Sequence, residues 1–435
     1  IKGAADACGI RLAYSNNNTF SSNTAFSHIN AGLVAYGIDI FDANDNTFNS
    51  STSVSNVTSN TDDAYGIWLE EHSSNNTFSS STAISHLAAN NDTYGIYLLN
   101  AANNNNFTGT SIANLSCENA YGVFLNQSDN NSFNDTAVSS LNATDDACGI
   151  YLLYSNNNTF SSSTSASDIT AANSSACGIY LGGSGDNTFS SSTSVSNITA
   201  ANSSACGIFL ALANYNTFIN FTITEITSGS STTSYGVYLA GVGVGFPCSN
   251  NVFSGGSIYS TGDPHIIDYA VWLENCTHNT INESEILNNG HGFWLNQSDN
   301  NTIERNLIVN NKALAISGAF LTTDSDYNEM HENCFYDNGL EHQAWDNGTG
   351  NNWTGNFWDD YTPPPPYLIY GSANSVDSSP LAYCPSGDDD GDGVPNDVEG
   401  AVDSDGDGTP DYPVSYTHLR AHETVLDLVC RLLLE

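Results

Sequence analysis

The chain of 435 residues carries 47 Asp and Glu against six Lys and Arg, which gives a formal net charge of −41. A surface so poor in bases cannot neutralise phosphates, so nucleic-acid binding and a basic membrane-surface patch are excluded. The sequence has no apolar run long enough to span a bilayer, and we expect no membrane segment in this fragment. It starts at Ile1, just ahead of a repeat unit and without a signal peptide, which indicates a truncated N-terminus.

A repeat of 22 to 29 residues runs along most of the chain and is its strongest signal. Each unit reads Tyr or Cys, Gly, Ile or Val, any residue and Leu, and continues through an Asn-rich turn to Asn-Thr-Phe. The segment Tyr65–Leu69, followed by Asn76–Phe78, is one example. The glycines of successive units lie 27 to 29 residues apart: Gly37, Gly66, Gly95, Gly122, Gly149, Gly178, Gly207 and Gly236.

The composition of this unit predicts strands. It is rich in Ile, Val, Tyr, Phe and Thr, is broken by Asn, Ser and Gly, and lacks a helical period, so each unit should hold three short strands and three turns. No single unit can bury its own inner face, and stacking must supply the core. We therefore predict an all-β fold, a right-handed parallel β-helix of about 11 to 12 coils over residues 1–345, with a C-terminal cap over residues 346–384.

The direction of the side chains follows from the period of two along a strand. In Tyr65–Leu69 this predicts that Tyr65, Ile67 and Leu69 point inward and that Gly66 and Trp68 point outward. The Asn of each Asn-Thr-Phe turn should stack on its counterparts in a hydrogen-bonded ladder. Three cysteines replace the Tyr of neighbouring coils and are expected as small buried packing residues of the inner column: Cys148, Cys177 and Cys206.

The outward position between the inward Ile and Leu is aromatic in nine coils: Trp68, Tyr97, Phe124, Tyr151, Tyr180, Phe209, Tyr238, Trp272 and Trp294. Because neighbouring strands lie about 4.8 Å apart, these residues predict a continuous aromatic stripe. Exposed apolar stripes are typical of binding surfaces, and flat rings suit the faces of sugars, so carbohydrate is the expected ligand. The alternatives are a stripe covered by loops, a face for self-association, or a structural ladder stabilised by about 0.5–1.5 kcal/mol for each ring pair.

The repeat resembles the NosD-like family of parallel β-helices, also described as carbohydrate-binding and sugar-hydrolase (CASH) domains. The segment Gly292–Ile303 carries the likeness most clearly, and Gly355–Tyr361 resembles that family's closing cap. The resemblance implies the fold but not one activity, since this architecture hosts many functions. Copper handling in the founding family would require Met, His or Cys clusters, whereas Met330 is the only methionine and the histidines are scattered.

Catalytic residues are not assigned. Polysaccharide lyases of this fold use an Arg or Lys base, and glycoside hydrolases need two facing carboxylates. The bases ahead of residue 414 are Lys2, Arg11, Arg305 and Lys312. A polysaccharide-cleaving enzyme therefore stays an alternative, as does a structural stalk or adhesin without a specific ligand.

Residues 385–413 predict calcium binding. Calcium loops place oxygen ligands at positions 1, 3, 5, 7 and 12 around a glycine. The first loop supplies Asp388, Asp390, Asp392, Val394 and Glu399, and a second, truncated loop supplies Asp403, Asp405, Asp407, Thr409 and Asp411. The pair resembles thrombospondin type 3 repeats, which implies Ca²⁺ as a cofactor and a stiff linker.

The last segment, residues 414–435, shares no composition with the rest and resembles a translated sequencing adapter, so we exclude it from the fold. The sequence as a whole predicts an extracellular or cell-surface β-helix that presents a binding face, with glycans as the expected partner.

Overall fold

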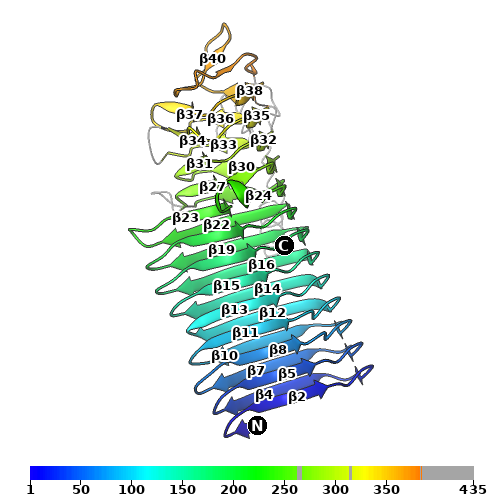
Figure 1. The fold of residues 1–435 in the computed structure, drawn as a ribbon. Helices are drawn as coiled ribbons and strands as arrows, with labels where there is room; N and C mark the ends of the chain where they lie inside the picture. The colour runs from blue at the N-terminus through cyan, green and yellow to red at the C-terminus, as the bar shows by residue number, and fades with distance from the viewer. Residues whose placement is uncertain (262–266, 313–315, 383, 385–435) are drawn as a thin grey trace, which may run out of the picture.

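The computed structural model describes residues 1–261, 267–312, 316–382 and 384. Each coil adds one strand to a 13-stranded sheet, here called the first sheet, and further strands to a 26-stranded second sheet. The strands lie one above another along a single axis (Figure 1), and every pairing is parallel except that of β40 with β41. The prediction of a parallel β-helix is confirmed, with thirteen coils in the described residues where the sequence indicated 11 to 12.

The first sheet contains β2 (Ala7–Ala13), β5 (Ala35–Phe41), β8 (Ala64–Glu70), β11 (Asp92–Leu99), β13 (Asn119–Asn126), β15 (Ala147–Leu153), β17 (Ala176–Gly182), β20 (Ala205–Ala211), β23 (Ser234–Ala240), β27 (Tyr269–Glu274), β31 (His291–Asn296), β34 (Ile316–Leu321) and β37 (His342–Asp346).

The second sheet contains β1 (Lys2–Gly3), β3 (Thr19–Phe20), β4 (Thr24–Ala31), β6 (Thr47–Phe48), β7 (Thr52–Ser59), β9 (Thr77–Phe78), β10 (Thr82–Ala88), β12 (Asn106–Cys117), β14 (Ser132–Ala143), β16 (Thr159–Ala171), β18 (Thr188–Phe189), β19 (Thr193–Ala200), β21 (Thr217–Ile219), β22 (Phe221–Ser228), β25 (Val252–Ser254), β26 (Ser257–Tyr259), β29 (Thr280–Asn282), β30 (Glu285–Leu287), β32 (Thr302–Glu304), β33 (Leu307–Val309), β35 (Glu329–His331), β36 (Cys334–Tyr336), β38 (Asn352–Thr354), β39 (Phe357–Trp358), β40 (Tyr367–Leu368) and β41 (Val376–Asp377). A two-stranded pair, β24 (Cys248–Ser249) with β28 (Cys276–Thr277), and a 3₁₀ turn, η1 (Gly243–Gly245), complete the described elements.

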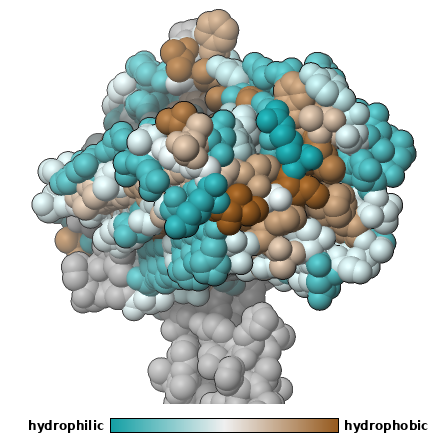
Figure 2. All heavy atoms as spheres, turned by 90° about the horizontal axis from the view of Figure 1, so that it is seen from below, coloured by the Kyte–Doolittle hydropathy of each residue, from teal (hydrophilic) through white to brown (hydrophobic). Residues whose placement is uncertain are grey.

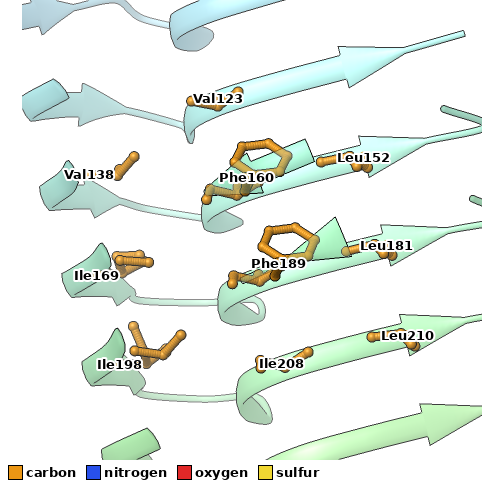
Figure 3. Close-up of a cluster of buried hydrophobic side chains, with 14 of the residues drawn as sticks. Val123, Val138, Leu152, Phe160, Ile169, Leu181, Phe189, Ile198, Ile208 and Leu210 are labelled. Atoms are coloured by element: carbon orange, nitrogen blue, oxygen red, sulfur yellow. The ribbon is translucent and has the colours of Figure 1, made fainter. Parts of the chain in front are cut away.

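The core is a set of apolar columns that run along the axis. Figure 3 shows Phe160 above Phe189, and Leu152, Leu181 and Leu210 in line beside them. All five side chains are fully buried. The same stacking continues to the N-terminal coil. Seen from that end, apolar residues lie in the middle of the face and hydrophilic ones around them (Figure 2). Such continuous stacking is required because no single coil can bury its own inner face.

The predicted alternation is wrong at two neighbouring positions of the repeat. Tyr65 lies on the outer face and stacks on Trp68, whereas Gly66 and Ile67 both face the core. A Cβ on Gly66 would lie 2.5 Å from Ile84 Cγ2 and 2.5 Å from the carbonyl oxygen of Gly95, so only glycine fits. The glycine therefore inverts the parity, because Tyr65 and Ile67 on its two sides lie on opposite faces, whereas strict alternation puts both on the same face.

The same inversion places the three cysteines of the repeat outside the core. Cys148, Cys177 and Cys206 are buried, as predicted, but beneath the aromatic rings of the outer face. Their assignment to an inner column was wrong for the reason that applies to Tyr65. Their Sγ atoms do not form a disulfide.

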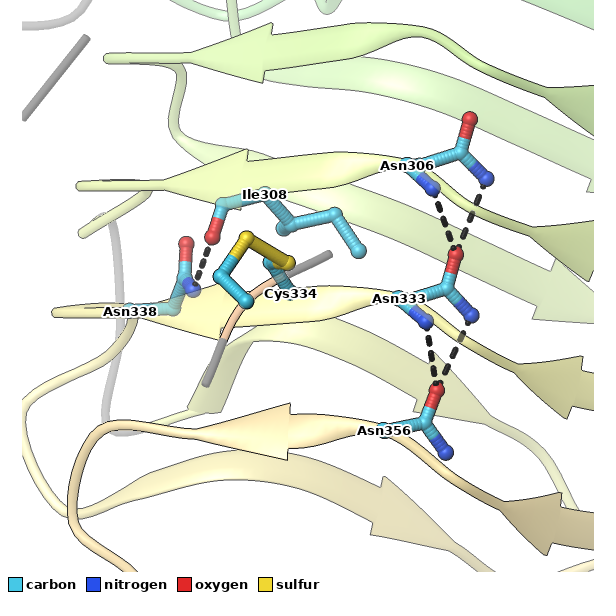
Figure 4. The surroundings of a disulfide bond; sticks show 7 residues. Asn306, Ile308, Asn333, Cys334, Asn338 and Asn356 are labelled. Atoms are coloured by element: carbon cyan, nitrogen blue, oxygen red, sulfur yellow. Dashed lines mark hydrogen bonds between the residues drawn. A yellow bond between two sulfur atoms is a disulfide. The ribbon is translucent and has the colours of Figure 1, made fainter. Parts of the chain in front are cut away.

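Asparagine ladders run through the turns, as predicted. The longest joins thirteen residues, of which the first twelve each donate to the Oδ1 of the next: Asn18, Asn46, Asn76, Asn105, Asn131, Asn158, Asn187, Asn216, Asn251, Asn279, Asn301, Asn328 and Asn351. A second ladder appears in Figure 4, where Asn306 donates to Asn333 and Asn333 to Asn356 at 3.0–3.1 Å.

Carboxylates end these ladders within residues 346–377. Asn356 donates to Asp377 at 2.8 Å, and Asn351 donates to Asp346 at 2.8 Å. A third ladder, which runs from Asn289 through Asn311 and Asn338 to Gln343, ends where Gln343 donates to Asp359. A carboxylate accepts without donating, so it closes a ladder that would otherwise leave its last amide unpaired. The Cys334–Cys384 disulfide ties the end of this region to β36. The described residues contain no helix long and apolar enough to cross a membrane.

Candidate functional site

The outer face of the first sheet carries a band of aromatic side chains two columns wide, which we call the aromatic band. The nine residues predicted from the sequence form one column in register, with Tyr97 beside Trp68 and Trp294 beside Trp272. Two members that the repeat signature missed, Phe320 and Trp345, extend this column. The second column contains residues that alternation had assigned to the core or that had not been singled out: Tyr36, Tyr65, Tyr94, Tyr121, Tyr235, Tyr269 and His291.

In the N-terminal half the rings of the two columns stack on one another. Tyr65 lies 5.3 Å from Tyr36, 5.0 Å from Tyr94 and 4.7 Å from Trp68, centroid to centroid, with interplanar angles of 15° or less. Most of each ring face is therefore covered by another ring. Tyr65 is 7% and Phe124 9% exposed. This part of the band is a small second core outside the sheet.

The stacking changes where cysteines replace the tyrosines. Tyr151 and Tyr180 pack against the thiols, and their rings stand at 82° to Phe124 and Phe209 respectively. Burial raises the pKa of the Cys148 thiol well above its ordinary value, so it is protonated at neutral pH. A neutral buried thiol packs as a small apolar group and is not a nucleophile.

Carboxylates line the margin of the band. Asp63 accepts from Tyr65 Oη at 2.9 Å and from Asn91 Nδ2 at 2.7 Å. One coil further, Asp92 accepts from Tyr94 Oη at 2.9 Å and from Asn119 Nδ2 at 2.8 Å. Burial raises the pKa of Asp92 above its usual value. These acids hold the tyrosine hydroxyls in place and remain partly exposed beside the rings.

The opposite margin also carries acids. Burial, with the negative charges of Asp39 and Glu71, raises the pKa of Glu70 to about 7. Glu274 accepts from Tyr238 Oη in the C-terminal half. At the N-terminal end the first column changes from rings to an ion pair, in which Arg11 Nε lies 3.2 Å from the buried Asp39 carboxylate.

Two indole N–H groups of the band, those of Trp68 and Trp272, are covered and have no acceptor among the described residues. Buried polar atoms are normally paired, so such atoms require an explanation.

A groove with a volume of about 760 Å³ lies elsewhere, on the second sheet at the bend of β7, β10, β12, β14 and β16. The bend residues, such as His86 with a φ of +57°, have left-handed backbone conformations, and one such residue bends each strand. The lining is mostly uncharged and polar: Asn56, Thr58, His86, Leu87, Ala88, Asn114, Leu115, Ser116, Ser140, Leu141, Asn142, Asp168 and Thr170.

The predicted calcium ligands, from Asp388 to Asp411, lie outside the described residues. Within the described residues, no group of three or more His, Cys, Asp or Glu side chains is placed to hold a metal ion.

Fold and surface together define the class of protein, a parallel β-helix with an aromatic outer face. The chain belongs to the NosD family: the family model described as periplasmic copper-binding protein (NosD) matches residues 77–262 and 230–363, well over half of the sequence. No curated protein matches the chain.

Among solved structures, the chain is similar to the A-modules of two mannuronan C-5 epimerases of Azotobacter vinelandii. The AlgE6 module is 12% identical with a TM-score of 0.34, covering 75% of this chain and 88% of that one. The AlgE4 module is 11% identical with a TM-score of 0.35, covering 77% and 89%. The receptor-binding tailspike of bacteriophage Det7 is 7% identical with a TM-score of 0.24, covering 82% and 74%. These TM-scores support no inference about what this chain binds.

The family description names copper, and the side chains of the described region do not fit such a site. Copper prefers soft or imidazole ligands gathered at one point. Met330 is buried in the core, and no three His, Cys, Asp or Glu side chains of the described residues are grouped so that they could hold a metal ion. No chemistry through copper is derived for this chain.

Proposed function

We propose that this protein binds glycan chains along the aromatic band. The observation that carries the proposal is the band itself, an unbroken outer surface of rings from Trp68 to Trp345, with hydrogen-bonding carboxylates and amides in register at its margins. Sugars present apolar faces to rings and hydroxyls to polar groups. A surface with rings in the middle and acceptors beside them suits both.

A band built only for packing is the competing possibility, and the stacked rings around Tyr65 favour it for the N-terminal coils. The covered indole N–H groups of Trp68 and Trp272 argue against a band built for packing alone. Packing alone would leave two buried donors without acceptors, at a cost of about 1–3 kcal/mol each.

The C-terminal coils are the favoured contact region. Trp272 and Trp294 bring the large indole rings of two consecutive coils together at 5.4 Å, and Phe320 of the next coil lies 4.2 Å from Trp294. All three side chains are partly exposed.

A glycan array probed with the whole chain tests the proposal. We expect retention on a defined set of oligosaccharides, without shortening of the ligand. Shortened products would identify a polysaccharide-cleaving enzyme, and the absence of any response would favour a stalk without a ligand.

We also propose an extracellular or periplasmic location. The Cys334–Cys384 disulfide supports this, because disulfides persist in oxidising compartments. The family description of a periplasmic protein agrees.

Calcium binding by residues 388–411 is a separate proposal that rests on the loop spacing alone. Six to eight hard oxygens, a glycine at the bend and a closing bidentate carboxylate are what Ca²⁺ prefers. The first loop offers this set from Asp388 to Glu399.

A further inference from the structure

The charges around the aromatic band restrict which glycans it can take. Acids lie along both margins over several coils: Asp63, Asp92 and Asp146 on one side, and Glu70 and Glu274 on the other. Each side chain is partly exposed. A chain lying on the band would pass within a few ångströms of these groups.

Compensating cations are missing from this face of the described chain. Arg11 is its one Lys or Arg there, and the guanidinium is paired with Asp39. The other three bases ahead of residue 414 are elsewhere. Lys2 is in β1 of the second sheet, Arg305 lies in the turn after β32 and is paired with Glu304, and Lys312 lies in the turn after β33 and is paired with Asp337.

The hydrogen bonds of the margin explain how these acids would meet a sugar. Asp63 and Asp92 each accept a tyrosine hydroxyl and an asparagine amide, so their oxygens are already set up as acceptors. A sugar hydroxyl donates to such an oxygen, whereas a sugar carboxylate cannot. At physiological ionic strength the Debye length is about 8 Å, so a carboxylate on the ligand would feel these charges with little screening.

We propose that the ligand of the aromatic band is an uncharged glycan, and that uronate-containing polysaccharides are excluded by charge. This inference rests on the proposed function and adds the class of sugar. Rings supply the contact, carboxylates accept sugar hydroxyls, and the same carboxylates repel polyanions.

The test uses the whole chain and three sets of oligosaccharides of matched length: neutral, uronate and amino-sugar. Binding is measured in EDTA at 20 and 300 mM NaCl. We expect neutral members to bind with an affinity that changes less than about twofold with salt, and uronates to bind at least about tenfold more weakly at low salt.

The double variant Asp63→Asn and Asp92→Asn removes two charges and keeps the shape of both side chains. It should raise the affinity for uronates more than that for neutral glycans, and so narrow the difference between the two. Asp135→Asn is the matched control, an exposed acid of β14 on the second sheet, and should change neither.

Each outcome separates this inference from the proposed function. Uronates that bind as tightly as neutral glycans at low salt would overturn the inference and leave glycan binding standing. Amino sugars that bind best, with a steep loss in salt, would do the same. If no oligosaccharide of the three sets binds, the proposal of glycan binding itself is refuted.

Discussion

Replacing Gly178 by alanine tests whether the repeat glycines face the core. A Cβ at this position would lie 2.3 Å from Val195 Cγ1 and 2.7 Å from the carbonyl oxygen of Gly207. Val195 is fully buried, and the carbonyl belongs to the next rung. Neither neighbour can move without disturbing the stack. Overpacking of this kind costs about 1–3 kcal/mol, and a clash with backbone belongs at the upper end, so we expect a loss of at least about 2 kcal/mol.

Strict alternation gives the opposite sign. A glycine on the outside of a strand would gain about 0.4–1 kcal/mol on replacement by alanine, because the unfolded chain loses freedom. Urea unfolding followed by tryptophan fluorescence distinguishes the two, with hydrogen exchange to locate the change in β15, β17 and β20, since repeat arrays need not unfold in one step. Gly245→Ala is the matched control, because nothing lies within 4 Å of its Cβ. A Gly178→Ala protein as stable as the parent would refute the inward position.

Three further predictions concern the cap, the margin of the band and the acidic segment. Asp377→Ala should lower the free energy of unfolding by about 3 kcal/mol or more, because Asn356, Trp358 and the Gly355 N–H lose their acceptor; thermal melting beside Asp324→Ala, an exposed turn acid, checks this. The raised pKa of Glu70 means that the folded chain holds its proton up to pH of about 7 while the unfolded chain releases it near 4.5, so stability from this group falls between these values as pH rises. Glu70→Gln should therefore raise the melting temperature at pH 8 more than at pH 5, and equal shifts would contradict this assignment. Calorimetric titration of the whole chain with Ca²⁺ should show a heat of binding that is lost in Asp392→Ala. An unchanged heat of binding in that variant would refute the assignment of the calcium loop.

The sequence predicted the fold and one column of the site, because both depend on spacing. The recurrence of Gly, Ile and Leu sets the coil, and the residue between Ile and Leu must alternate outward, as Trp68 and Trp294 do. The direction of Tyr65 could not be read from alternation, because the parity is inverted by a glycine whose missing Cβ lets β8 approach Ile84. The recurrence of glycine at that position, in coil after coil, is the signal that could have revealed it.

The margin and the cap depend on contacts that spacing does not carry. Asp63 and Asp92 stand in turns of different composition, and only the stacked coils bring each acid to a tyrosine hydroxyl. The acids that close the ladders could not be predicted from spacing for the same reason. A long segment of chain separates Asp377 from Asn356, from which it accepts a hydrogen bond. Phe320 was missed because β34 departs from the repeat signature.

The central claim, that the aromatic band binds glycan, is tested most directly by the affinity of Trp272→Ala for a glycan retained on the array. Truncation of an aromatic anchor typically costs 2 kcal/mol or more, so the account predicts a loss of at least about 30-fold, with partial recovery in Trp272→Phe. Tyr327→Ala, an equally apolar truncation at an exposed turn away from the band, should bind as the parent does. An unchanged affinity in Trp272→Ala, with the variant folded by circular dichroism, would contradict the account.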